Sequence, residues 1–171
     1  MSGALISGVA ATLAVAATAP AGSATMTSAP PPAATAPAPG YGAPVTLERA
    51  RRLIAAAQAE ASKHDFLMAF AVVEPSGALV AFERMDGVQY GSLEVAQAKA
   101  RAAALYRRPS KAWADAIAAG RAGVVTFPNV VAAEGGIPIV ADGKIVGAIG
   151  VSGGTSEQDG AVAMAALAAT P

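Results

Sequence analysis

The sequence predicts an α+β domain, with a mainly antiparallel sheet and flanking helices in the order α-ββ-α-α-ββ-α. Short apolar runs occur in two pairs, and each pair is joined by a turn too tight to hold a crossover helix, so its strands are antiparallel neighbours. Segments with helical spacing precede, separate and follow these pairs, which is the pattern of an α+β class.

The first half of this pattern begins with a helix over residues 46–63, where Thr46 is a good N-cap and apolar residues recur at helical spacing. A strand pair over 67–74 and 78–84 follows, joined by the turn Pro75-Ser76-Gly77. The strands are apolar on both faces, so we expect helices or another subunit to cover both, a first indication of oligomerisation.

The second half begins with an Ala-rich helix over 92–106, capped by Ser92, and a short helix capped by Ser110. Residues 120–135 look irregular. Strands over 136–142 and 144–151 flank Asp142-Gly143, a strong hairpin signal. The last helix opens after 152–155, with Ser156 and Asp159 in a loose capping pattern.

The amino-terminal part is different, because the chain has 12 basic and 12 acidic residues and none lies before Glu48. Residues 1–24 resemble a secretory signal, with an apolar run followed by small-x-small sites, although the usual basic residues are missing. Residues 25–44 are rich in Pro and Ala and are predicted as a disordered linker, which leaves 45–171 as a single domain. We expect a periplasmic or secreted protein with no stable membrane span after leader removal, or a cytoplasmic one if the leader is not a signal.

Composition excludes several kinds of site. Neutral, unclustered charge argues against a nucleic-acid partner. The absence of Cys excludes disulfides, thiolate nucleophiles and cysteine metal sites, and a single His excludes a multi-histidine site within one subunit. No nucleophile elbow or close carboxylate pair is present, so a generic hydrolase is not expected.

A few side chains are candidates for binding chemistry. Lys99 has two interpretations, a cleft residue that binds a carboxylate or a lysine on a solvated face, and its spacing alone favours the second. His64, Tyr90, Met85 and Tyr106 carry atoms that ligate haem iron, although a lone His at a helix end more often meets the helix dipole or solvent. Met68 has the same donor atom but lies in an apolar strand and is expected in the core.

The glycine-rich segments 135–138 and 147–154 are the most distinctive. The second segment presents backbone N–H groups at a helix N-terminus, which is a ready anion site. The equally weighted alternative is a tight strand-to-helix turn whose glycines pack against another subunit.

Five segments together resemble the GlcG/HbpS-like family, which includes the carboxy-terminal domain of PduO-type proteins. In order, they are Ala71-Val72-Val73 with Gly77, Arg84-Met85-Asp86-Gly87, Ala98-Lys99-Ala100, Gly135-Gly136-Ile137-Pro138-Ile139, and 145–154 with Asp159. The resemblance covers roughly 45–168. It implies a profilin- or PAS-like sheet, haem as cofactor and a homo-oligomer, possibly an octamer.

The resemblance also implies site residues. The family-like positions are Lys99, Gly135, Gly136, Pro138, Gly153 and Asp159. Some members place a hydroxyl near haem iron just before the double glycine, so we expect the iron ligand from Thr126, Tyr90 or His64, in that order. We expect the propionates to meet Lys99, Arg101 or the backbone near Gly153-Gly154. Apolar contacts are expected from Phe127, Ile137 and Val151.

The leading hypothesis is therefore an exported, oligomeric haem-binding protein that senses or scavenges haem or iron. Haem degradation has been attributed to the family, but no catalytic motif supports it here. The alternative is an enzyme or binding protein for a small organic acid or aldehyde, which uses the same inter-subunit pocket. A third hypothesis is a purely structural oligomer.

Overall fold

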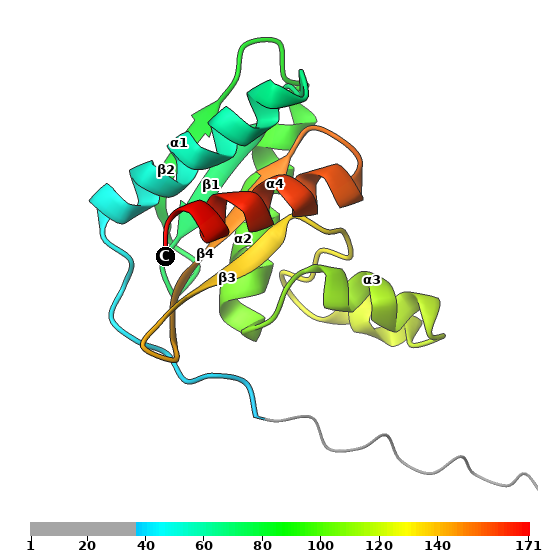
Figure 1. Cartoon of the computed structure of the whole chain (residues 1–171). Coiled ribbons are helices and arrows are strands. Elements are labelled where there is room, and N and C mark those ends of the chain that lie inside the picture. Colours follow the sequence, from blue (N-terminus) through cyan, green and yellow to red (C-terminus); the bar gives the residue numbers. More distant parts are fainter. Residues whose placement is uncertain (1–36) are drawn as a thin grey trace, which may run out of the picture. The chain divides into compact units, whose positions relative to one another are not determined.

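The computed structural model describes residues 37–171 and confirms the α+β class (Figure 1). The leader predicted over 1–24 lies outside the described residues. The elements are α1 (Leu47–Lys63), β1 (Ala69–Val73), β2 (Leu79–Arg84), α2 (Gly91–Tyr106), α3 (Lys111–Ala118), the 3₁₀ helix η1 (Ala122–Thr126), β3 (Gly136–Ala141), β4 (Lys144–Ser152) and α4 (Ser156–Ala169). They follow the predicted order, with η1 added in the segment expected to be irregular.

The sheet has the strand order β2-β1-β4-β3, and all neighbouring strands are antiparallel. Each predicted hairpin is present, and the two hairpins join through β1 and β4 in the centre. Helices α1 and α4 cover one face of the sheet, and α2 covers the other (Figure 1). Both faces are thus covered within one chain, so the two-sided apolar strands do not themselves require another subunit.

Glycines in β4 allow close contact between the sheet and its neighbours. A Cβ atom on Gly150 would overlap the carbonyl oxygen of Ala96 and lie 2.6 Å from the backbone nitrogen of Ala100, both in α2. A Cβ atom on Gly147 would overlap the carbonyl oxygen of Val73 in β1. These two glycines pack against their own chain, so packing against another subunit is the wrong explanation for them.

The helix caps only partly follow the prediction. Thr46 caps α1 as expected and accepts a hydrogen bond from the Arg49 nitrogen at 3.2 Å. Helix α2 begins at Gly91, so its N-cap residue is Tyr90 rather than Ser92 and no side chain caps it. The Ser92 hydroxyl lies within the first turn and accepts from the Gln89 side chain. Helix α4 is capped by Thr155 and Gln158 in a reciprocal capping box, one residue earlier than predicted.

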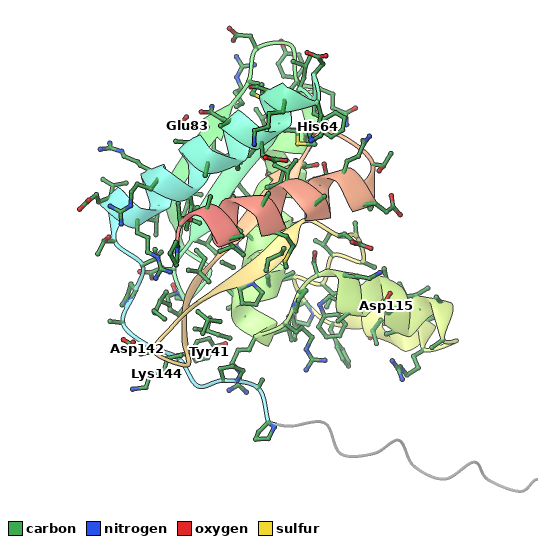
Figure 2. The ribbon with its side chains drawn as sticks, in the orientation of Figure 1. Tyr41, His64, Glu83, Asp115, Asp142 and Lys144 are labelled. Atoms are coloured by element: carbon green, nitrogen blue, oxygen red, sulfur yellow. The ribbon has the colours of Figure 1, made fainter. Side chains whose placement is uncertain are left out.

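The end of the predicted linker belongs to the folded domain. The Gly42 nitrogen donates to the Ile145 carbonyl at 2.8 Å, and the Ile145 nitrogen donates to the Gly40 carbonyl at 2.9 Å. Figure 2 shows Tyr41 beside the β3–β4 turn that carries Asp142 and Lys144. The carboxyl end of the linker predicted over 25–44 is therefore ordered, because Gly40 and Gly42 pair with Ile145 of β4. Among the helices of residues 37–171, none is long and apolar enough to cross a membrane.

Candidate functional site

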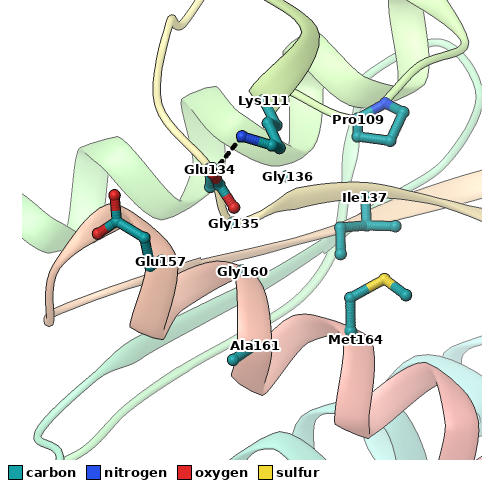
Figure 3. A pocket seen from close by; sticks show the side chains of 10 residues that line it. All are labelled: Pro109, Lys111, Glu134, Gly135, Gly136, Ile137, Glu157, Gly160, Ala161 and Met164. Carbon is teal, nitrogen blue, oxygen red and sulfur yellow. Dashed lines mark hydrogen bonds and ion pairs between the residues drawn. The ribbon is translucent and has the colours of Figure 1, made fainter. Parts of the chain in front are cut away.

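Two surface hollows gather many of the glycines and charged groups of interest. The β3–α4 pocket encloses about 390 Å³ and is lined by Pro109, Lys111, Glu134, Gly135, Gly136, Ile137, Glu157, Gly160, Ala161 and Met164 (Figure 3). The α1–β1 hollow encloses about 500 Å³ and is lined by Asp65, Phe66, Leu67, Gly87, Val88, Gln89, Gly153, Gly154 and Gln158. The predicted glycines are thus divided between two sites rather than gathered in one.

A buried ion pair lies behind the β3–α4 pocket. The Lys99 ammonium, on α2, donates to the Asp159 carboxylate at 2.6 Å and to the Val151 carbonyl at 3.2 Å. The two side chains of the pair are only 2% and 3% exposed. The interpretation of Lys99 as a lysine on a solvated face is therefore wrong. A propionate at the surface is also beyond its reach, because its ammonium is enclosed and already bound.

The double glycine makes room for this pair. Gly135 has a φ of +115°, and a Cβ atom there would lie 2.9 Å from Asp159 Cβ and 3.1 Å from Lys99 Nζ. A Cβ atom on Gly136 would overlap the Lys99 carbonyl oxygen. Ser110 fixes the same loop, because its hydroxyl donates to the Ala133 carbonyl at 2.5 Å and accepts from the Gly136 nitrogen at 2.9 Å. The predicted cap residue Ser110 thus holds a loop rather than capping α3 with its side chain.

Burial raises the pKa of the Asp159 carboxyl above its ordinary value, while the Lys99 ammonium and the backbone amides of Gly154 and Gly153 act in the opposite direction. The carboxylate also accepts a hydrogen bond from the Gly154 nitrogen at 2.9 Å. The expected anion site at the start of α4 thus has an occupant from within the chain. An external propionate would have to displace Asp159 to use the Gly154 amide.

The α1–β1 hollow has the protein's single imidazole beside it. His64 follows the last residue of α1 (Figure 2), and its ring stacks on Phe66 with the ring centroids 5.4 Å apart. Its Nε2 atom lies 3.3 Å from the Glu60 carboxylate, and 53% of its side chain is exposed. Tyr90 directly follows the lining residue Gln89 and is 82% exposed. Two of the three predicted iron ligands are therefore sequence neighbours of residues that line this hollow, and of the two only His64 has a contact with a lining residue described here, through Phe66.

The remaining predicted site residues lie elsewhere. The Thr126 hydroxyl, in η1, donates to the Gly123 carbonyl at 2.8 Å, and the ring of Phe127 meets Trp113 edge-on at 6.3 Å. Arg101 donates to the Gly77 carbonyl at the β1–β2 turn, at 3.3 Å. Pro138 is half-buried in β3 opposite Ala148, outside the lining of both hollows.

The other donor atoms considered are occupied or enclosed. Met68 is fully buried, as predicted, and Val151 is equally buried, so it offers no surface to a cofactor. Met85 packs against the core, and the Tyr106 hydroxyl donates to the Pro128 carbonyl at 2.6 Å. Within residues 37–171, no group of three or more His, Cys, Asp or Glu side chains is placed to hold a metal ion.

Comparison with known proteins settles the family. The family described as haem degrading protein HbpS-like matches residues 45–168. This chain belongs to the HbpS-like family. Among HbpS-like relatives, protein GlcG of Escherichia coli K12 is 44% identical over 105 residues, which cover 61% of this chain and 78% of GlcG.

Solved structures of HbpS-like proteins share the fold. A double mutant of Streptomyces reticuli HbpS matches with a TM-score of 0.71 and 29% identity, over 84% of this chain and 99% of HbpS. The complex of PduOC with haem matches with a TM-score of 0.69 and 27% identity, over 74% of this chain and 94% of PduOC. Haem is thus the ligand of one structural relative.

Sequence reasoning missed the charged rim that this HbpS-like chain builds around the β3–α4 pocket. Lys111 donates to Glu134 at 2.8 Å and to Asp115 at 3.1 Å, and Glu157 lies on the same pocket. Lys111 and Glu134 are 23 residues apart and no spacing rule connects them. The one local signal was the position of Glu134 directly before the double glycine.

Proposed function

We propose that this protein binds haem at the α1–β1 hollow, with His64 as the ligand of the iron. One observation carries the proposal: the chain's single imidazole is half-exposed and stacks on Phe66, which lines the hollow. Imidazole is a common axial ligand of haem iron. Membership in the HbpS-like family and the haem-bound structure of PduOC support the same ligand.

One side of the hollow suits a flat apolar ring. Phe66 and Leu67 give it an apolar wall, and Leu67 is 49% exposed, so it offers surface that a porphyrin would cover. Asp65, Gln89 and Gln158 make the rest of the lining polar. The Glu60 carboxylate beside His64 Nε2 resembles the carboxylate–histidine arrangement found at metal-binding histidines. This partner would fix the ring and leave the second nitrogen for the iron.

Each residue at this proposed site then has a defined role. His64 would bind the iron, Glu60 would orient its ring, and Phe66 with Leu67 would shield the porphyrin face from water. Haem supplies an iron that exchanges single electrons when it is bound. The proposed role is haem binding for sensing or scavenging. It includes no catalytic step, because the proposal assigns no catalytic task to a residue beside the hollow.

We also propose export and self-association. The signal-like pattern of residues 1–24 supports export, and sequencing of the mature amino terminus from cells tests it, with an intact Met1 as the contrary result.

Exposed apolar side chains on η1 and the loop after it, Val125 at 59% and Phe127 at 50%, support self-association. Light scattering of the purified protein tests this, and a monomeric mass would contradict it.

Haem titration of the purified protein, followed by absorption spectroscopy, tests the binding site. We expect a shifted Soret band with the features of an imidazole-bound iron, and loss of those features in His64→Ala. Thr126→Ala is the matched control, because Thr126 was expected first among the iron ligands and lies outside both hollows. An unchanged spectrum in His64→Ala, or no Soret shift at micromolar protein, would overturn the proposal.

A further inference from the structure

The β3–α4 pocket separates apolar and charged groups into two ends. Figure 3 shows Ile137 and Met164 facing each other at one end, with Pro109 above them, and the side chains of Lys111, Glu134 and Glu157 toward the other. Met164 is 59% exposed although it is a long apolar side chain on a helix. A pocket of about 390 Å³ with this division suits a small ligand that has an apolar tail and one charged head.

The charges at the polar end determine which head fits. Lys111 already donates to two carboxylates, those of Glu134 and Asp115. Glu157 forms no ion pair with any residue in the described part of the chain. Among the residues that line the pocket, one ammonium therefore faces two carboxylates, and the net charge at this end is negative.

The surroundings keep these groups ionised. The hydrogen bond with Glu134 raises the pKa of Lys111, so its ammonium stays charged and bound. The backbone amide of Glu157 and the Thr155 hydroxyl lower the pKa of the Glu157 carboxyl, so it remains an anion near neutral pH. Glu157 thus holds a negative charge at the edge of the pocket, where the Lys111 ammonium also acts on it without forming an ion pair.

The floor of the pocket is formed by residues without side chains. Gly135, Gly136 and Gly160 all line it. A Cβ atom on Gly160 would lie 3.0 Å from the Glu134 carboxylate, although alanine there would favour α4 by about 1 kcal/mol. Glycine in the middle of the pocket floor keeps Glu134 close to the helix and leaves the hollow open.

We propose that the β3–α4 pocket binds a small organic cation, a primary ammonium group attached to a short alkyl or aryl tail. The ammonium meets Glu157 and the free oxygen of Glu134, while the tail lies between Ile137 and Met164. A small organic acid is disfavoured, because its carboxylate would face this excess of negative charge. The site is separate from the α1–β1 hollow and its binding does not depend on haem.

Titration of the full chain with benzylammonium, benzyl alcohol and benzoate, followed by backbone amide NMR, tests the proposal. The three probes share one ring and differ in the charge of the head. We expect saturable shifts for benzylammonium at the amides of Gly135, Gly136 and Gly160, weaker shifts for the alcohol, and none for benzoate. Equal or tighter binding of benzoate at these amides, or no saturable shift with benzylammonium, would overturn the proposal.

Two substitutions locate the contacts. Glu157→Gln should weaken benzylammonium binding about threefold, which is the scale of an exposed ion pair. Glu94→Gln, in the first turn of α2, is the matched control and should leave binding unchanged. Met164→Ala should weaken benzylammonium and benzyl alcohol alike, and Glu157→Gln should leave the haem spectrum unchanged. Equal effects of Glu157→Gln and Glu94→Gln would contradict the assigned head-group contact.

Discussion

At the scale of single residues, the pair of Lys99 and Asp159 joins three elements at one point. Lys99 belongs to α2, Asp159 belongs to α4, and the ammonium also reaches the carbonyl of Val151 in β4. Both charges have left water, so each one depends on the other for compensation. The pair therefore makes the position of α4 sensitive to a residue on the opposite face of the sheet.

We expect Lys99→Met to lower the free energy of unfolding by about 3–5 kcal/mol, because it leaves the Asp159 carboxylate buried without its cation. Lys63→Met is the matched control. Lys63 pairs with Glu60 at the surface, where its side chain is 67% exposed, so its loss should cost at most about 1 kcal/mol. Urea denaturation followed by circular dichroism measures both values. Equal losses of unfolding free energy in the two variants would show that the buried pair contributes no more to stability than the surface pair.

The raised pKa of Asp159 predicts a dependence on pH. The carboxyl has an ordinary pKa of 3.8 and a higher one in the folded state. The folded chain therefore holds this proton more tightly than the unfolded chain does. The contribution of Asp159 to the free energy of unfolding is thus fully present below pH 3.8 and is lost as the pH rises through the folded pKa. Stability measured between about pH 3 and pH 7 tests this. The free energy of unfolding of the wild type minus that of Asp159→Asn should fall as the pH rises. An increase of this difference with pH would contradict a raised pKa of Asp159.

The sequence did not predict this pair, for a physical reason. Lys99 and Asp159 are 60 positions apart, and the alanines around Lys99 form no polar stripe that would mark the buried side. Helical spacing alone placed Lys99 on a solvated face. The family resemblance singled out both residues, but it did not show that they bind each other.

At the scale of elements, the predictions that succeeded depend on local chemistry. Asp142-Gly143 and the Pro75-Ser76-Gly77 turn determined both hairpins, because turn residues act over a few positions. The cap of α4 was misplaced by one residue, because Thr155 and Ser156 are both good capping residues and only the partner Gln158 decides between them. The strand order β2-β1-β4-β3 and the division of the glycines between two hollows depend on contacts between distant segments, which no local pattern encodes.

The contact between β4 and α2 leads to a prediction for Gly150. Gly150→Ala places a methyl group against the Ala96 carbonyl and the Ala100 nitrogen, and helix backbone cannot turn away as a side chain can. We expect a loss of about 3 kcal/mol in the free energy of unfolding. Gly91→Ala is the control, because a Cβ atom there meets nothing within 4 Å. Thermal and urea denaturation of both variants measure the difference, and a cost below that of the control would contradict close packing here.

At the scale of the whole molecule, residues 40–45 complete the central part of the sheet. Strand β1 pairs with Ala148–Ser152 of β4, and residues 40–45 bond to β4 at Ile145 and Val146, just beyond the end of β1. Tyr41 adds a contact with the other layer, because its hydroxyl donates to the Leu105 carbonyl of α2 at 2.8 Å. The amino-terminal segment thus fastens the sheet to the end of α2.

Two truncated chains, one beginning at Pro37 and one at Val45, should therefore differ in stability. The shorter chain loses the hydrogen bonds of Gly40 and Gly42 with Ile145 and the bond of the Tyr41 hydroxyl. At about 1 kcal/mol for each bond, we expect its free energy of unfolding to be lower by about 3 kcal/mol. Tyr41→Phe in the full chain isolates the hydroxyl and should cost about 1 kcal/mol. Urea denaturation measures all three values. Equal stability of the two truncated chains would show that the domain begins at Val45, as its sequence predicts, and that the contacts of residues 40–44 do not contribute to folding.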